Sequence, residues 1–150
     1  MTDHRVLAVE SKDYPDLDST TVWSLVADPA RLADWFPLVP LKPVSTVDPG
    51  PGTETRVSWR RGASPATAWR AVVTEWDAGT AYRCRIDRIP GLGEAELTVS
   101  VDTRPVGDGT RVTLRFVAAA DSRLRGLLAG FEARRRLSRS LDRIGRAARP

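Results

Sequence analysis

The chain has 150 residues, of which 41% are hydrophobic and 28% charged, with a formal net charge of +4, as in ordinary globular proteins. This length fits one domain, residues 1–150, with a core of its own. The single cysteine excludes an internal disulfide and a multi-cysteine zinc site. We expect no metal and no cofactor. No apolar run approaches the ~20 residues that span a bilayer and no signal-peptide core follows the first residues, so we expect a cytoplasmic protein.

The first third of the chain predicts one strand and two short helices. Residues 5–14 carry an apolar run that is typical of a strand. A cap at residues 18–19 then starts a short helix. Asp28-Pro29 ends that helix, because proline lacks an N–H and restricts the residue before it. A second short helix follows and carries Trp35 and Phe36 until the next prolines end it.

The middle of the chain alternates apolar and polar residues with a period of two. Glycine, proline and Asp-Gly turns separate the alternating runs. In the last run, Val112, Leu114 and Phe116 share one face. This pattern is typical of antiparallel strands with one solvated face. We expect these strands at residues 44–47, 53–61, 67–76, 81–88, 94–103 and 110–117.

Residues 122–149 predict one long helix, because they contain no proline and are rich in Arg, Leu and Ala. The apolar side chains of residues 124–131 cluster on one face at ~100° per residue. Those of residues 137–148 cluster on a face rotated by about a third of a turn, so we expect the two halves to pack against different things. The whole order predicts an α+β domain, in which a curved antiparallel sheet buries its apolar face against this helix.

Residues 21–37 carry a Val-Trp pair on the first helix, an Asp-Pro break, and a Trp followed closely by Pro. This stretch resembles the START-like (SRPBCC) superfamily, and specifically its bacterial polyketide cyclase/dehydrase branch, which is related in fold to the birch-pollen allergen. Weaker similarities follow in the family's order at residues 49–53, 73–77 and 109–113.

The resemblance implies a helix-grip fold, in which a seven-stranded antiparallel sheet wraps around the C-terminal helix and leaves a cavity between them. It implies less about activity. The superfamily includes lipid carriers, hormone receptors, chaperone activators and polyketide aromatase/cyclases.

Residues that could carry chemistry are few. His4 is the only histidine and lies at the N-terminus, so a catalytic triad is not expected. Cys84 lies on the inward face of its strand, where cysteine usually behaves as a small hydrophobic residue. Acid–base chemistry would need Tyr82, an inward arginine such as Arg61 or a carboxylate such as Glu75, and we choose Tyr82 as the catalytic candidate.

The first functional hypothesis is that the cavity binds a small, largely apolar molecule, aromatic or polyketide-like, with or without a cyclase or dehydrase step. Aromatic side chains fall on the inferred inner faces of the strands and short helices, where they form either core or ligand contacts. Trp23 and Trp76 are assigned to the core, whereas Trp69 is left undecided because both faces of its strand are apolar. The candidate ligand-binding residues are Trp35, Phe36, Trp59, Trp69, Tyr82, Cys84, Leu97, Val99, Leu114, Phe116, Leu128 and Phe131.

The basic charge is concentrated in the last helix. Residues 122–150 hold nine arginines against Glu132 and Asp142, a balance of +7, which leaves −3 for the rest of the chain. The simplest explanation is the solvated outer face of an amphipathic helix, and nucleic-acid binding is not expected because no binding motif accompanies the charge. The alternative hypothesis is a non-catalytic lipid or isoprenoid carrier that docks weakly on anionic membranes. Its contacts would be Arg135, Arg139, Arg143 and Arg146, and a monomer and a homodimer both stay open.

Overall fold

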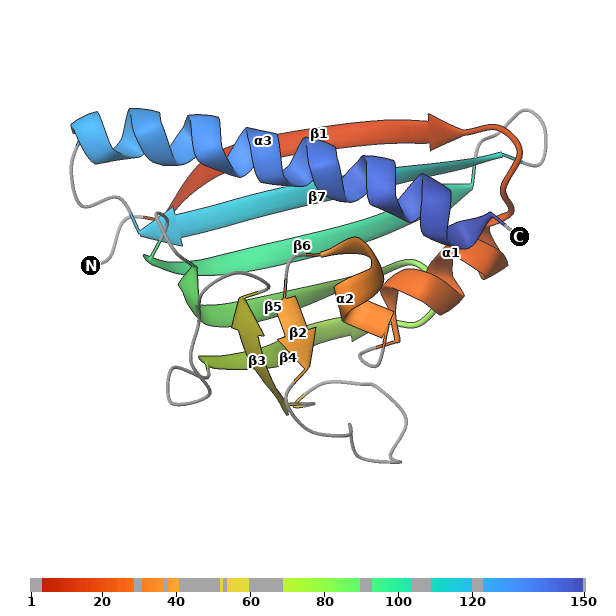
Figure 1. Cartoon of the computed structure of the whole chain (residues 1–150), viewed down its shortest axis with the longest axis horizontal. Coiled ribbons are helices and arrows are strands. Elements are labelled where there is room, and N and C mark those ends of the chain that lie inside the picture. The colour runs from red at the N-terminus through yellow and green to blue at the C-terminus, as the bar shows by residue number, and fades with distance from the viewer. Residues whose placement is uncertain are drawn as a thin grey trace.

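A computed structural model describes residues 4–28, 31–36, 38–40, 52, 54–59, 69–89, 93–103, 109–119 and 123–149. The elements in chain order are β1 (His4–Tyr14), α1 (Ser19–Val26), α2 (Leu32–Trp35), β2 (Leu38–Pro40), β3 (Glu54–Trp59), β4 (Trp69–Asp77), β5 (Ala81–Ile89), β6 (Gly93–Thr103), β7 (Thr110–Ala119) and α3 (Arg123–Ala148). This order confirms the predicted α+β class and the single long C-terminal helix (Figure 1).

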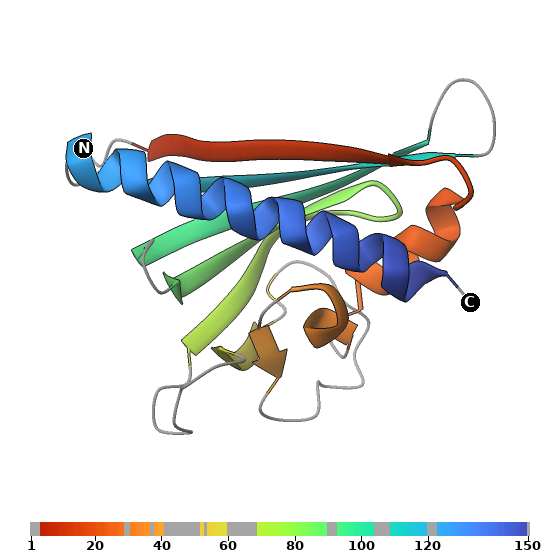
Figure 2. The same cartoon turned by 45° about the horizontal axis from the view of Figure 1, so that its top comes forward.

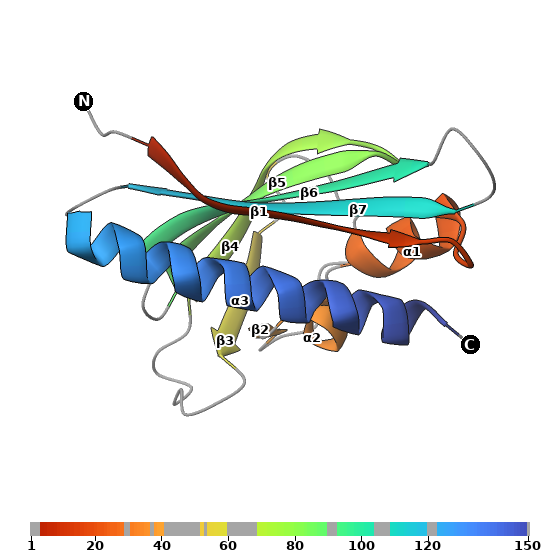
Figure 3. The same ribbon diagram turned by 90° about the horizontal axis from the view of Figure 1, so that it is seen from above.

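The strands form one antiparallel sheet in the order β1-β7-β6-β5-β4-β3-β2. Five strands are long, at nine to eleven residues, whereas β2 and β3 have three and six. The first strand, β1, pairs with the last strand, β7, although more than 90 residues separate them along the chain. Seen from above, the sheet lies on one side of α3, and its short strands turn back beneath the helix (Figure 3).

The short strand β2 differs from the prediction, which had Pro37 and Pro40 simply end the second helix. Leu38–Pro40 pairs with β3 at the end of the sheet order. Proline is tolerated there because an edge strand has a free side that needs no N–H donor. The strand predicted at residues 44–47 lies outside the described residues.

The helix α3 runs along β1 and across the sheet (Figure 2). In its second half, Leu137, Leu141 and Ile144 are buried and join the core formed with the sheet. In its first half, Phe131 is 70% exposed. The side chains of residues 123–129 lie outside the described part of the chain, so the prediction that the two halves pack against different things stays a prediction.

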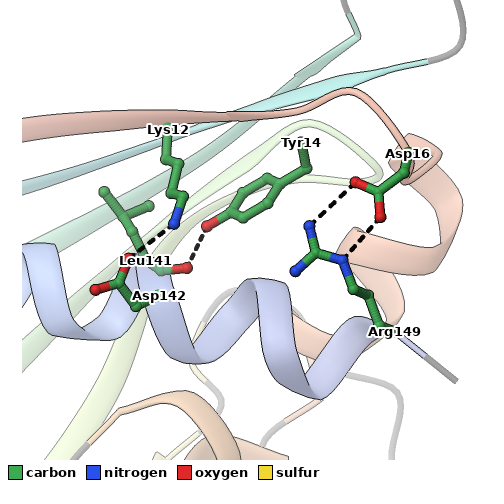
Figure 4. A network of polar contacts seen from close by, with 6 residues as sticks. All are labelled: Lys12, Tyr14, Asp16, Leu141, Asp142 and Arg149. Carbon is green, nitrogen blue, oxygen red and sulfur yellow. Dashed lines mark hydrogen bonds and ion pairs between the residues drawn. The ribbon is translucent and has the colours of Figure 1, made fainter.

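A buried tyrosine ties the second half of α3 to β1 (Figure 4). The Tyr14 hydroxyl donates a hydrogen bond to the Leu141 carbonyl oxygen, and burial raises the pKa of Tyr14 well above its ordinary value. Beside it, Lys12 Nζ lies 2.8 Å from Asp142 Oδ1. Tyr14 is the last residue of the strand predicted at residues 5–14, and no role was predicted for its side chain.

The residue directly after α3 forms an ion pair with the segment that follows β1. Arg149 Nε lies 2.7 Å from Asp16 Oδ2, and a second guanidinium nitrogen lies 3.1 Å from Oδ1, so the pair is bidentate. This contact lowers the pKa of the Asp16 carboxyl. Between the two ties, Gly145 is so close to the Tyr14 ring that an added Cβ would lie 2.9 Å from it. The end of the helix is thereby fixed against β1 and the segment after it.

Candidate functional site

The candidate site is the inner face of the sheet beneath α3. Leu97 of β6 pairs with Cys84 on one side and Phe116 on the other. Val99 pairs in the same way with Tyr82 and Leu114, which gives two parallel cross-strand rows. The inward orientation predicted for these strands is confirmed. The buried members of the two rows are Tyr82, Leu97, Val99, Leu114 and Phe116.

The short helix α2 closes one side of this face. Its last residue, Trp35, and the following Phe36 are both fully buried, as predicted. The ring centroids of Phe36 and Phe116 are 6.0 Å apart, and those of Trp35 and Phe36 are 5.5 Å apart. These distances are typical of favourable aromatic pairs. A continuous aromatic contact therefore runs from α2 to β7 of the sheet. The helix α2 also packs against α3 (Figure 3).

Tyr82, the catalytic candidate, is engaged in a structural contact. Its hydroxyl donates a hydrogen bond of 2.6 Å to the Val26 carbonyl oxygen at the end of α1. Its ring stacks on the Trp76 ring, with 5.6 Å between the ring centroids, and the Trp23 ring meets both of them edge-on. Burial raises the pKa of Tyr82 well above its ordinary value, which keeps the phenol neutral. A catalytic role for Tyr82 stays a prediction, and the hydrogen bond to Val26 argues for a structural one.

The other residues considered for chemistry are Cys84, Glu75 and Arg61. Burial raises the pKa of the partly buried Cys84 thiol to about 12, which keeps it protonated and a weak nucleophile. Glu75 is exposed, and its Oε2 atom lies 3.4 Å from Arg83 Nε, so it is not the desolvated carboxylate that acid–base chemistry would need. The reason is a β-bulge between Val73 and Glu75, which changes the faces of the residues after it. Arg61 lies outside the described residues.

The prediction that Phe131 faces inward is wrong, because 70% of the residue is exposed. The helix approaches β1 closely at Gly130, where an added Cβ would lie 3.4 Å from the Leu7 carbonyl oxygen. Successive helix positions turn by ~100°, so the next residue points away from the strand. The side chains of Trp59, Trp69 and Leu128 lie outside the described part of the chain, and their proposed roles stay predictions.

Two polar groups in the interior were missed by sequence reasoning. The Nε1 atom of Trp35 and the Oγ atom of Ser140 are buried and have no hydrogen-bond partner in the described part of the chain. The available signal was the position of Ser140, a polar residue between Leu137 and Ile144 on the apolar stripe of the predicted helix. Across the described residues no three His, Cys, Asp or Glu side chains gather as metal ligands, and no described helix is long and apolar enough to cross a membrane.

A sequence model of the family described as polyketide cyclase / dehydrase and lipid transport matches residues 7–149. The chain belongs to this family. The resemblance inferred from residues 21–37 is therefore confirmed. A search of curated proteins found no match.

Several solved structures share this fold. Norcoclaurine synthase from Thalictrum flavum, solved with dopamine and hydroxybenzaldehyde, has a TM-score of 0.67 and 15% identity over 97% of this chain and 87% of that one. Ara h 8.0201 has a TM-score of 0.65 and 13% identity, over 97% and 98%. CalU16 from Micromonospora echinospora has a TM-score of 0.58 and 19% identity, over 95% and 75%. At these identities the likeness shows the helix-grip fold alone.

Proposed function

We propose that this protein binds a small, largely apolar molecule, aromatic or polyketide-like, between α3 and the inner face of the sheet. The observation that carries the proposal is the aromatic contact from Trp35 through Phe36 to Phe116, beneath a helix that covers the inner face. Aromatic walls of this kind favour flat, apolar ligands, because they offer a large contact area and specific ring-to-ring geometry.

The family and its relatives support this ligand class. The family description includes polyketide cyclases, dehydrases and lipid transport, and the norcoclaurine synthase structure contains two small aromatic molecules. A cyclisation or dehydration step is a further part of the proposal. If Tyr82 took part in that step, its hydroxyl would first have to break the hydrogen bond that it now donates to the Val26 carbonyl oxygen.

Binding is tested with a panel of bicyclic and tricyclic aromatic and polyketide-like compounds, using thermal shift and tryptophan fluorescence. A ligand at 100 times its Kd stabilises the folded state by about 2.7 kcal/mol. For a chain of this size that raises the melting temperature by about 5–11 °C. Absence of any shift across the panel would contradict the proposal.

A matched pair of variants locates the binding. Phe116→Leu alters the buried aromatic wall, whereas Phe131→Leu makes the same change on an exposed residue. We expect weaker binding in the first variant and unchanged binding in the second. Equal affinities in the two variants would place the ligand elsewhere.

A second candidate function is a lipid carrier that docks on anionic membranes. The observation that favours it is an exposed row on α3, in which Phe131 precedes Arg135, Arg139 and Arg146. At ~100° per residue these four positions fall within about 80° of one another, opposite the buried face. Arg143, the fourth arginine of the original hypothesis, is partly buried and lies farther round the helix. Each arginine near an anionic bilayer contributes about 1 kcal/mol, and an exposed aromatic ring can enter the interface.

The test is co-sedimentation with vesicles of phosphatidylcholine, alone or with phosphatidylserine, at low and high salt. We expect salt-sensitive binding to the anionic vesicles that is lost in Arg135→Gln/Arg139→Gln/Arg146→Gln. The control is Arg85→Gln/Arg115→Gln, which removes exposed charges from the outer face of the sheet. Equal loss in the control, or no binding by the unmodified protein at low salt, would reject membrane docking.

A further inference from the structure

Two helices that pack against each other, α2 and α3, each carry a buried polar group with no partner among the described residues. Trp35 is 0% exposed and Ser140 is 1% exposed. Neither Trp35 Nε1 nor Ser140 Oγ has a hydrogen-bond partner among the residues that the structure describes. Such pairs are uncommon, because a polar group that leaves water and finds no new partner loses its hydrogen bonds without compensation. Two of them on elements that pack against each other therefore suggest a common binding partner.

The geometry of α3 directs Ser140 toward α2. Leu141 and Gly145 meet β1 through Tyr14, so they mark the side of the helix that faces that strand. Ser140 precedes Leu141 by one position, or ~100° of rotation, and therefore lies on the side away from β1. On that side α2, which ends with Trp35, packs against α3 beneath its second half (Figure 1).

The two groups suit one kind of ligand atom. An indole N–H can only donate a hydrogen bond, whereas a serine hydroxyl can donate or accept one. A single acceptor oxygen can therefore satisfy both. Both groups are neutral and their neighbours Phe36, Leu137 and Ile144 are buried and apolar. An uncharged acceptor fits these surroundings, because a carboxylate would bring in a charge.

The charged side chain one helical turn before Ser140 is already paired. Arg136 lies one turn before Ser140, and its Nε atom is 3.0 Å from Glu132 Oε1. We propose that Trp35 Nε1 and Ser140 Oγ together bind the carbonyl oxygen of an apolar ring ketone. This inference rests on the proposed function and narrows its ligand class from apolar aromatic compounds to those with one buried carbonyl group.

The test compares 1-tetralone with tetralin, two bicyclic probes that differ only in the carbonyl group, by isothermal calorimetry. Each hydrogen bond contributes about a fivefold gain in affinity, so the unmodified protein should prefer tetralone by at least tenfold. Ser140→Ala should weaken tetralone about fivefold and leave tetralin unchanged. Trp35→Phe also changes the apolar wall, so it should weaken tetralone about fivefold more than it weakens tetralin. Ser24→Ala, at an exposed serine of α1, is the matched control and should change neither affinity.

Infrared spectroscopy gives a second, direct readout. The carbonyl stretch of bound tetralone should lie at lower frequency in the unmodified protein than in Ser140→Ala, because a hydrogen bond weakens the C=O bond. Alanine is a good helix former, so this variant is expected to fold even if Trp35→Phe does not, and circular dichroism checks this.

The outcomes separate the inference from the proposed function. If both probes bind equally and Ser140→Ala changes neither, the proposed function stands and the carbonyl inference is overturned, with a buried water as the partner of the two donors. If only Trp35→Phe weakens tetralone, the paired site is overturned. If neither probe binds, the proposed function and the inference both fail for this class of compound.

Discussion

The two tyrosines of the chain provide a sharp test of how α1 is held. Both are buried and both donate to a backbone carbonyl, Tyr82 to Val26 and Tyr14 to Leu141. Val26 is the last residue of α1, so its carbonyl has no donor from the helix itself. Leu141 lies inside α3, where the N–H of Gly145 also bonds to its carbonyl.

The substitutions to phenylalanine should therefore differ in cost. Tyr82→Phe removes a hydrogen bond and leaves a buried carbonyl without a partner, which we expect to lower the free energy of unfolding by about 2 kcal/mol. Tyr14→Phe removes a hydrogen bond but leaves the Leu141 carbonyl paired, so about 1 kcal/mol is expected. For a chain of this size, the first loss corresponds to about 4–8 °C in melting temperature.

The measurement is urea unfolding at 25 °C, followed by far-UV circular dichroism, with the dependence on urea concentration compared among the three proteins. An equal m value is required, because only then does a shifted midpoint report stability. If Tyr82→Phe loses no more than Tyr14→Phe, the argument that the end of α1 depends on Tyr82 is refuted.

Three further predictions concern the helix face, the thiol and the C-terminal ion pair. Leu137→Ala should lower the free energy of unfolding in urea by about 3 kcal/mol and Phe131→Ala by less than about 0.5 kcal/mol, because only Leu137 is buried. Similar losses in the two variants would contradict the assignment of the helix faces. Burial raises the pKa of Cys84 from 9.0 to about 12 in the folded protein. The contribution of the protonated thiol to the free energy of unfolding is therefore complete below pH 9 and is lost as the pH rises from 9 toward 12. Under reducing conditions Cys84→Ala should reduce the slope of stability against pH by about 1.4 kcal/mol per unit in that range, and an unchanged slope would contradict the burial argument. Arg149→Gln should raise the pKa of Asp16 toward its ordinary value in an NMR titration, because the guanidinium now lowers it, and an unchanged titration would exclude the ion pair in solution.

The sequence by itself determined the class of fold and most of the candidate site. Period-two alternation identified the inner faces of β5, β6 and β7, because side chains in a paired strand must alternate between core and solvent. The absence of proline and the helical spacing of leucines identified α3. The motif at residues 21–37 indicated the family, and the helix that follows its Asp-Pro break does bring Trp35 and Phe36 into the interior.

Tertiary structure alone decided the rest, because periodicity specifies which residues share a face and not what that face meets. The bulge before Glu75 changed the alternation at a point that no local signal marks, and turned a candidate acid to the surface. The close approach of Gly130 to β1 set the rotation of α3 and left Phe131 exposed. The same rotation set the side of α3 on which Ser140 lies, and only the packing of α2 against α3 decides what that side meets.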